Sequence, residues 1–445
     1  MPRLLEDKTT GTNIIWGTDS YAYRGDDYSF FSPITPRLIT GECSDVIKNY
    51  ARKVLEQQNK TLYESSGIFT PLNICHRMND DADTAWFGHS GAFDTAQVDF
   101  SNVQGHRTWK NYVDARRLEI ACGEAPYIVS RYDVTTGEAI RTDKRIGLLD
   151  RKLRIVNENA SDEAEWLKWT IRAFQSTYGY EFRGDNLLIA RVNMLMAFEE
   201  NMLMHLHRRP TQKEWLRMAN IIAWNIWQMD GLTSRPPSKT SDIDSFAYSY
   251  QTSLFDIEER EKPNTENNPL PSERETPLCR VYDWRRDISV EFANSQKGRR
   301  KMKFDFIIGN PPYQDEIACK NRAFAKHIYD KFLESAYEIS DRVEMIHPAQ
   351  FLFNAGGTPW NWNKKMLGDT HVRIMDYVPD SSEIFPNADI AGGIVITYRD
   401  AKKEFTPISA IASPAELNYV LKVAARKGTL KDIAEKHLVE PEAES

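Results

Sequence analysis

The chain has 445 residues, 41% hydrophobic and 27% charged, with a net charge of −7 and a pI of about 5.8. These proportions are ordinary for a globular protein, and single domains rarely exceed ~300 residues, so more than one structural unit is expected. The acidic balance excludes a histone-like coat of positive charge, which leaves only a local patch for any nucleic acid. We expect neither a signal peptide nor a membrane span, because no apolar run approaches the ~18 residues that a span needs.

The five cysteines are scattered along the chain, and none forms a Cys-x-x-Cys pair. This usage is typical of proteins in a reducing compartment and argues against a zinc site. We therefore expect a cytoplasmic protein without a metal centre.

The first half of the chain predicts short strands that alternate with helices. Residues 134–160 are polar and predict turns. Asp185 is expected to cap the helix after the second strand. Thr211, with Glu214 three residues later, predicts a capping box at the next helix. The expected strands are 118–121, 176–182 and 225–232, and the expected helices are 163–174, 186–209 and 211–225.

The second half repeats this alternation after two polar segments. Residues 233–278 are rich in Pro, Ser, Asn and charge, which is typical of a flexible insertion. Residues 297–303 are basic and predict either a solvated loop or a contact with DNA phosphates. Strands are expected at 304–308, 342–353, 372–378 and 392–400, with a helix at 323–340. The pattern predicts an α/β fold with a mostly parallel sheet covered on both faces.

Acidic and small residues stand where the predicted strands end. Ligands of open α/β sheets bind at the carboxyl ends of the strands. A small-residue turn, Ala121–Gly123, follows the first strand, Glu181 ends the second, and Asp230 with Gly231 ends the third. A carboxylate can accept hydrogen bonds from ribose hydroxyls or an adenine amino group. Because no P-loop is present, these residues predict a pocket for an adenosine-bearing cofactor other than ATP.

The stretch Asn310-Pro311-Pro312-Tyr313 directly follows the apolar strand 304–308. The prolines fix φ and remove backbone donors, so the Pro311 carbonyl is held in a set direction. The Asn310 side chain supplies a second acceptor, and two acceptors suit an NH₂ group. Tyr313 offers a ring that could stack on a planar base. This pattern favours transfer of a group to an amino nitrogen, promoted by alignment of the reactants.

These motifs, in this order, resemble the gamma-class DNA adenine-N6 methyltransferases of bacterial restriction–modification systems. The resemblance covers roughly residues 12–425 and rests on GIFTP, RRLEIACGEAP, YGYEFRGDN, NIWQMDGL and FIIGNPPYQ. It implies a Rossmann-like class I fold with a seven-stranded sheet, helices on both faces, a helical N-terminal region and insertions. It also implies S-adenosylmethionine as cofactor and double-stranded DNA as partner.

The resemblance also assigns roles to residues. Asn310 and Pro311 would hold the target amino group, with Pro312 in the same catalytic motif, and Tyr313 would stack on the flipped base. Glu181 would bind the ribose and Asp230 would face the cofactor adenine. The remaining residues expected to bind the cofactor are Phe69, Thr70, Pro71, Glu119, Ala121, Cys122, Gly123 and Gly231.

Two departures from the family pattern bear on function. Ala125 stands where a second glycine is common, and a long segment at about 128–170 separates the cofactor loop from Glu181. Two other functions therefore stay open. The same chemistry would act on RNA or on a protein glutamine, or the chain would be a degenerate methylase that serves as a DNA-binding scaffold.

The resemblance divides the chain into five parts. A target-recognition domain is absent from this division, so we expect a specificity subunit, an endonuclease subunit or a further domain as a partner. The parts are an N-terminal region with the Phe-Thr-Pro motif (1–110), a cofactor-binding half (111–232), an insertion (233–278), a catalytic half (279–405), and a C-terminal helix and tail (406–445).

Cys122 and two tryptophans can be interpreted singly. Cys122 is interpreted as a small buried side chain and not as a nucleophile, because neither His nor Lys follows it closely. Trp360 and Trp362 are interpreted as core anchors, with a DNA-facing loop as the alternative.

Overall fold

The structure is a computed structural model, and it describes most of the chain. The described residues are 2–57, 69–101, 103, 105, 107–237, 277–292, 302–314, 326–353, 357–386 and 390–408. Most of the expected insertion, the basic residues 297–301 and nearly all of the expected C-terminal helix lie outside these ranges.

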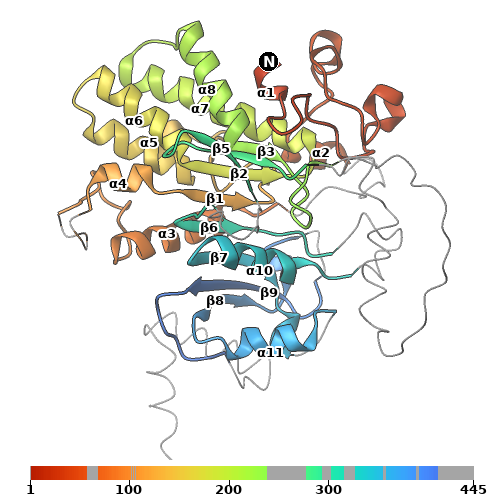
Figure 1. The fold of residues 1–445 in the computed structure, drawn as a ribbon, viewed down its shortest axis with the longest axis vertical. Coiled ribbons are helices and arrows are strands. Elements are labelled where there is room, and N and C mark those ends of the chain that lie inside the picture. The colour runs from red at the N-terminus through yellow and green to blue at the C-terminus, as the bar shows by residue number, and fades with distance from the viewer. Residues whose placement is uncertain are drawn as a thin grey trace, which may run out of the picture.

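A seven-stranded sheet forms the centre of the molecule, in the order β3-β2-β1-β6-β7-β9-β8 (Figure 1). The neighbouring strands β3, β2, β1, β6 and β7 run parallel, whereas β9 runs antiparallel to both of its neighbours. This is the mostly parallel sheet that the sequence predicts. Its strands are β1 (Arg117–Ile120), β2 (Thr177–Glu181), β3 (Ile226–Gln228), β6 (Phe306–Gly309), β7 (Arg342–Pro348), β8 (Val372–Val378) and β9 (Ile394–Asp400).

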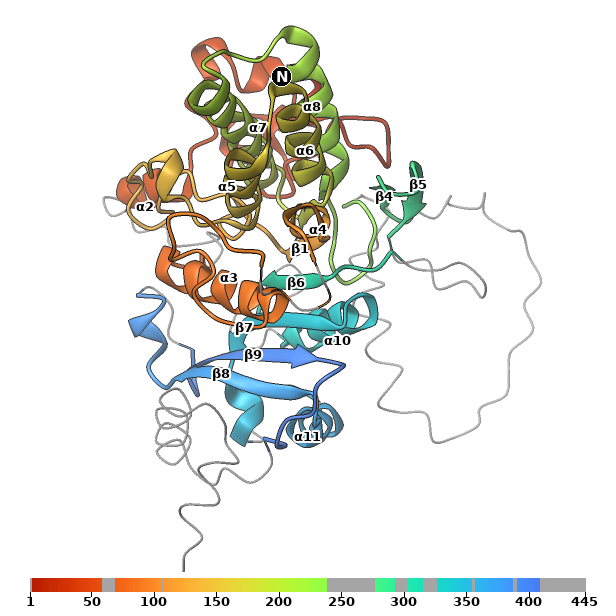
Figure 2. The same cartoon turned by 90° about the vertical axis from the view of Figure 1, so that its left-hand side faces the viewer.

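Helices cover both faces of this sheet. Figure 2 shows α3 and α10 on opposite sides of β6 and β7, with α5 to α8 gathered beside the β1–β3 half. The helices are α1 (Pro2–Leu5), α2 (Tyr50–Gln57), α3 (Leu72–Phe87), α4 (Trp109–Asp114), α5 (Leu148–Asn159), α6 (Glu163–Gln175), α7 (Gly184–Leu206), α8 (Gln212–Asn225), α10 (Tyr329–Ile339) and α11 (Trp360–Gly368).

Strand β6 is buried on both faces, and its alternating side chains enter different cores. Phe306 and Ile308 pack with α3, whereas Ile307 packs with α10 and α11. This alternation is the expected period of two along a strand. A separate hairpin, β4 (Arg280–Asp283) and β5 (Ile288–Glu291), adds Val281 to the α10 side. The sheet therefore holds the residues that follow β6 between two packed layers.

The prediction of turns at 134–160 is wrong, because α5 occupies residues 148–159 of it. Its apolar residues recur at helical spacing, but Arg151 and Lys152 stand among them and hide the pattern. Both cations are buried: Arg151 pairs with Asp83, and the Lys152 ammonium donates to the Ala115 and Ser176 carbonyls. Together α5 and α6 form the connection between β1 and β2, so this segment is part of the core and not an appended insertion.

The prediction that Asp185 caps α7 is also wrong. Arg183 is the N-cap residue, and it makes no side-chain cap. Asp185 is instead fully buried, where it accepts hydrogen bonds from the Tyr21 hydroxyl (2.9 Å) and the Lys53 ammonium (2.9 Å). Burial raises the pKa of Asp185, but the charges of Arg183 and Lys53 outweigh it and hold this pKa far below its usual range. Asp185 thus joins the N-terminal region to the first turn of α7. The Thr211–Glu214 capping box is confirmed.

The N-terminal segment packs against the core through Arg191 of α7. Its buried guanidinium donates to the carbonyls of Leu4 (2.7 Å), Glu6 (3.0 Å) and Ile226 (2.7 Å). Burial lowers the pKa of Arg191 to about 10. Among the described residues, no helix is both long and apolar enough to cross a membrane.

Candidate active site

The candidate site lies where β1 and β6 end side by side. From β1 the chain passes to β2 on one side of the sheet, whereas β6 lies on the other side, so this is the point at which the strand order reverses. Such a switch point is where open α/β sheets bind ligands. Ile120 pairs with Gly309 in the parallel ladder. Ala121 and Asn310 therefore leave neighbouring strands at the same level.

The turn after β1 is built from residues with positive φ. Ala121 (φ 46°), Gly123 (φ 53°) and Ala125 (φ 64°) all lie in the left-handed region. This conformation costs a non-glycine residue about 1–2 kcal/mol. Ala125 adopts it with its methyl group fully buried, and its amide donates to the Cys122 carbonyl (2.6 Å). The backbone that a glycine would favour is thus kept at Ala125, and the departure from the family pattern adds only a methyl group.

Glu181, at the end of β2, joins this turn to the neighbouring strand. One carboxylate oxygen accepts from the Gly123 amide (2.8 Å) and the other from the Arg183 amide (3.0 Å). Burial raises the pKa of Glu181, and these two amides act in the opposite direction. A carboxylate has about four acceptor positions, so two hydrogen bonds leave it able to accept more.

Asp230 and Gly231 follow β3 and lie beside β2. The Asp230 carboxylate accepts from the Leu232 amide (2.9 Å), which forms a local turn. A Cβ atom on Gly231 would lie 2.3 Å from the Phe332 ring and 3.1 Å from the Tyr180 ring. Phe332 of α10 therefore occupies the space beside the ends of β2 and β3. The sequence predicts a helix at 323–340, but its periodicity does not tell that Phe332 is the apolar residue that reaches the site.

Glu119 and Cys122 are enclosed by the core. The Glu119 carboxylate accepts from the Ile128 amide (3.1 Å), so it anchors the loop after β1. Burial raises the pKa of Glu119, and nearby Glu181 raises it further. Cys122 is 1% exposed, and burial raises the pKa of its thiol. A buried thiol of raised pKa is a poor nucleophile, in agreement with the interpretation of Cys122 as a packing residue.

The Phe-Thr-Pro motif reaches the site from the start of α3. The Phe69 ring lies 2.7 Å from the position that a Cβ atom on Gly123 would take, so only glycine fits beneath it. The same ring packs on Tyr50, with 4.5 Å between ring centroids. Thr70 is 2% exposed, and Pro71 is the N-cap residue of α3. The motif therefore lies directly against the turn after β1.

Asn310 meets the Phe-Thr-Pro motif from the opposite side. Its side-chain nitrogen donates to the Thr70 hydroxyl (3.3 Å). Pro311 is buried and Pro312 is exposed. Tyr313 is half-buried and packs on the core formed by α3 and β6, and burial raises its pKa, while a hydrogen bond with Asn310 lowers it. The structure thus brings Phe69 to Gly123, Thr70 to Asn310 and Gly123 to Glu181.

Glu124 belongs to the same turn, although sequence analysis gave it no role. It is 1% exposed, and its carboxylate accepts from the Tyr50 amide (2.6 Å) and the Tyr132 hydroxyl. Burial raises the pKa of Glu124 to about 7, against the hydrogen bond from Tyr132 and the charge of Lys53. A buried carboxyl in a turn is not recognisable from sequence, because acids in turns are usually solvated.

The raised pKa of Glu124 predicts a loss of stability as pH rises. Between the unfolded pKa and about 7, the folded protein binds more protons than the unfolded chain, so the free energy of unfolding falls through this window. The total fall is roughly 3 kcal/mol. In Glu124→Gln this fall in the free energy of unfolding is expected to vanish. Urea unfolding of both proteins from pH 4.5 to 7.5 measures the free energy. The contributions of other buried carboxyls cancel in the difference between the two proteins. Identical pH profiles would contradict the assignment.

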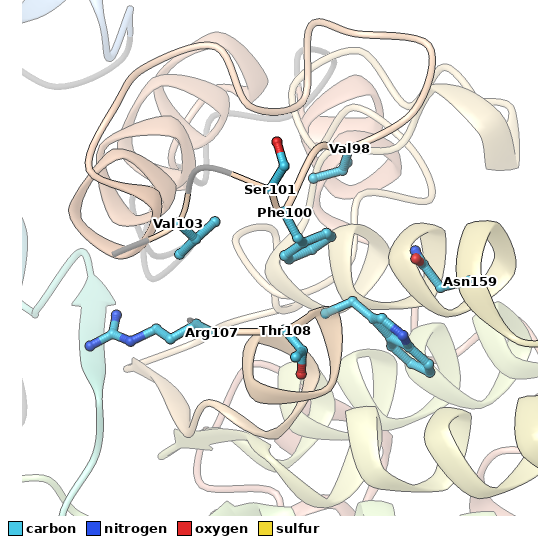
Figure 3. A pocket seen from close by; sticks show the side chains of 8 residues that line it. Val98, Phe100, Ser101, Val103, Arg107, Thr108 and Asn159 are labelled. Carbon is cyan, nitrogen blue, oxygen red and sulfur yellow. The ribbon is translucent and has the colours of Figure 1, made fainter. Parts of the chain in front are cut away.

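A hollow elsewhere on the surface lies away from this site. Its lining includes Val98, Phe100, Val103 and Asn159, which Figure 3 labels, together with Trp109. Helix α4, which contains Trp109, lies just before the first residue of β1 in the chain. The hollow is therefore at the edge of the sheet opposite Asn310 and takes no part in the candidate site.

The strand order, with an antiparallel β9 between β7 and β8, defines a class I methyltransferase fold of the kind that uses S-adenosylmethionine. Residues 175–385 match the profile of the family described as Eco57I restriction-modification methylase. This match includes β2, β3 and the Asn310–Tyr313 motif. Phe69–Pro71 and the turn after β1 precede it.

Individual proteins are similar to parts of this chain. The chain is 34% identical over 117 residues to an uncharacterized adenine-specific methylase of Mycoplasma pneumoniae, a match that spans 26% of this chain and 28% of the relative. Two solved structures are more distant. The DNA-bound Type ISP restriction-modification enzyme LlaBIII has 14% identity and a TM-score of 0.37, covering 81% of this chain and 21% of its own. A modification subunit of a putative type I restriction enzyme from Vibrio vulnificus has 13% identity and a TM-score of 0.34. The match covers 84% of this chain and 56% of the Vibrio subunit.

Proposed function

We propose that this chain methylates the N6 amino group of adenine in double-stranded DNA, as the modification part of a restriction–modification system. One observation carries the proposal. Asn310 leaves β6 at the same level at which Ala121 leaves β1, so an amino-binding motif stands beside a glycine turn at the switch point. The family match across residues 175–385 supports the same chemistry.

The residues around Gly123 fit an adenosine-bearing cofactor. Gly123 lacks a side chain where a Cβ atom would meet Phe69, a carboxylate (Glu181) ends β2, and another (Asp230) follows β3. In the proposal, Phe69–Pro71, Ala121 and Cys122–Gly123 surround the methionine part, with Glu119 supporting this turn from the core. Glu181 binds the ribose, and Asp230–Gly231 lie at the adenine.

Asn310–Tyr313 would hold the substrate in this proposal. When bound, S-adenosylmethionine would supply a methyl group whose carbon bonds to N6 as its bond to sulfur breaks, and the proton that N6 then loses would pass to solvent. The Asn310 and Pro311 oxygens would accept the two N6 hydrogens and so direct the nitrogen lone pair. Alignment of this kind can replace a strong base as the source of rate. Tyr313 would stack on the adenine, which must leave the duplex at a cost of a few kcal/mol.

The proposed setting is the cytoplasm, with double-stranded DNA as the macromolecular partner. A separate specificity or endonuclease subunit, or a further domain, would choose the DNA sequence. Reduced cysteines agree with this compartment, since the four described cysteines are free and burial raises the pKa of Cys75, Cys122 and Cys279.

The deciding experiment offers the full chain radiolabelled S-adenosylmethionine with duplex DNA, RNA or a protein fraction. N6-methyladenine in DNA, identified by mass spectrometry, is the expected product. Label found in RNA or in protein glutamine would show that RNA or protein, and not DNA, is the substrate. Tight binding of DNA without any transfer would favour a scaffold that has lost its activity.

Gly123→Ala is expected to weaken binding of S-adenosylmethionine by about tenfold or more. The added Cβ atom would lie 2.7 Å from the Phe69 ring, at a residue whose φ is +53°. Backbone strain of about 1–2 kcal/mol and displacement of Phe69 both act on the proposed cofactor turn. Titration calorimetry measures the affinity, for which about 1.4 kcal/mol corresponds to a tenfold change.

Gly88→Ala is the matched control. Gly88 also has a positive φ (+88°), but it ends α3 at the opposite edge of the sheet, and nothing lies within 4 Å of its added Cβ atom. It should carry a similar backbone strain and leave cofactor affinity unchanged. Equal affinity in both variants would remove Gly123 from the cofactor site.

A further inference from the structure

A chain of buried side chains leads from Asn310 into the core beneath α3. Asn310 lies next to Thr70, Thr70 next to Tyr127, and Tyr127 next to Met78. Thr70, Tyr127 and Met78 are at most 2% exposed. The Cys75 thiol also donates to the Thr70 carbonyl (3.5 Å), which fixes the backbone at this position. The Thr70 hydroxyl is therefore held rigidly.

The buried end of this chain sets the direction of its hydrogen bonds. The Met78 thioether has no hydrogen to give, so the Tyr127 hydroxyl must donate to its sulfur (3.2 Å). The oxygen of Tyr127 is then an acceptor for the Thr70 hydroxyl. Burial raises the pKa of Tyr127, and the interaction with the Thr70 hydroxyl acts in the opposite direction.

The direction of these hydrogen bonds decides which end of the Asn310 amide faces Thr70. A hydroxyl has one hydrogen, and that of Thr70 is given to Tyr127. Thr70 can then only accept, so Asn310 must present its NH₂ group, at 3.3 Å. The flipped amide, with its oxygen and nitrogen exchanged, would set two acceptors against each other. The carbonyl oxygen of Asn310 is thereby turned away from Thr70.

We propose that Thr70 is a positioning residue, whose buried hydroxyl fixes the Asn310 amide so that its carbonyl oxygen faces the amino group to be methylated. The inference rests on the proposed function and extends it, because the sequence places Thr70 only at the cofactor. An amide that rotates freely would present its NH₂ group to a substrate NH₂ group in part of the molecules, and no hydrogen bond would form.

Thr70→Val tests this role. Valine keeps the shape of the side chain but cannot accept a hydrogen bond. We expect kcat for methyl transfer to fall by about 10- to 100-fold, the loss typical of a misplaced reacting group, with little change in the KM for S-adenosylmethionine. Thr70→Ser, which keeps the hydroxyl, should recover most of kcat. Thr177→Val is the matched control, because the buried Thr177 hydroxyl bonds to the Ala173 carbonyl at the other end of β2.

A raised KM for S-adenosylmethionine with an unchanged kcat would overturn the inference and leave Thr70 as a cofactor residue. Loss of kcat in both Thr70→Val and Thr70→Ser would also overturn it, because the hydroxyl would not be the cause.

A second measurement does not depend on catalysis. In protein labelled with ¹⁵N at asparagine, the Asn310 side-chain amide is identified by its loss in Asn310→Ala. Its hydrogen-bonded proton should be shifted downfield in the wild type and in Thr70→Ser, and not in Thr70→Val. An unshifted wild-type proton refutes the inference. If the wild type methylates no DNA but this shift is present, the proposed function fails while the orientation of Asn310 stands.

Discussion

Asn310→Ala is expected to reduce methyl transfer by about 10²- to 10³-fold, the usual cost of removing one hydrogen-bonding group aimed at a reacting centre. The variant loses one of two proposed acceptors for the amino group but keeps Pro311 and the prolines that fix the backbone. Asn310 lies at the end of β6 and contacts Thr70, so truncation leaves the core of the strand intact. Single-turnover rates with saturating DNA and S-adenosylmethionine measure the effect on the chemical step.

Asn159→Ala is a suitable control for this experiment. Asn159 ends α5, where its side chain donates to the Ile155 carbonyl (2.9 Å), at the opposite edge of the sheet from Asn310. It should retain the wild-type rate. A rate for Asn310→Ala within about twofold of the wild type, with both ligands bound, would show that the methyl acceptor is held elsewhere.

Asp83→Ala is expected to destabilise the protein by about 3–5 kcal/mol, because it leaves the buried Arg117 guanidinium without a carboxylate and removes one of the two carboxylates that pair with Arg151. Asp83 is 2% exposed and accepts from Arg117 (2.9 Å), Arg151 (2.5 Å) and the Tyr112 hydroxyl (2.6 Å). The four side chains come from α3, α4, β1 and α5. The midpoint of urea unfolding, followed by tryptophan fluorescence, measures the loss.

Asp80→Ala is the comparison for Asp83. It also pairs with Arg151 (2.7 Å), but its side chain is 40% exposed. Exposed ion pairs contribute about 0–1 kcal/mol, so Asp80→Ala should cost less than about 1 kcal/mol. Equal losses in the two variants would mean that burial does not control the energetics of this cluster.

Strand ends are the most predictable part of this chain. The sequence predicts β1, β2 and β6 with their following residues, because apolar runs that stop at small, acidic or proline residues mark both a strand and its end. The helix α3 is not predicted. Its sequence, LNICHRMNDDADTAWF, contains charges that pair with partners far along the chain, as Asp83 does with Arg117 and Arg151. A pattern based on helical periodicity therefore predicts that these charged positions are solvated.

The two tryptophans of α11 show the same limit at the level of single residues. Trp362 is 6% exposed and packs on Phe351, which confirms a core anchor, whereas Trp360 is 62% exposed, so its interpretation as a core anchor is wrong. Both residues look equally apolar in sequence, and only the phase of a short helix separates them. The contact of Thr70 with Asn310 is likewise out of reach of sequence patterns, since the two residues lie far apart along the chain.

Helix α3 connects the candidate site with the buried ion pairs of Asp83. Thr70 lies just before its first turn, at the candidate site, and Asp83 lies near its other end, several turns further along the axis. The ion pairs of Asp83 with Arg117 and Arg151 therefore anchor this far end of α3 to β1 and α5. A genetic screen for lost methylation should return substitutions at both ends of α3: at Thr70, which positions Asn310, and at Asp83, which anchors the helix in the core.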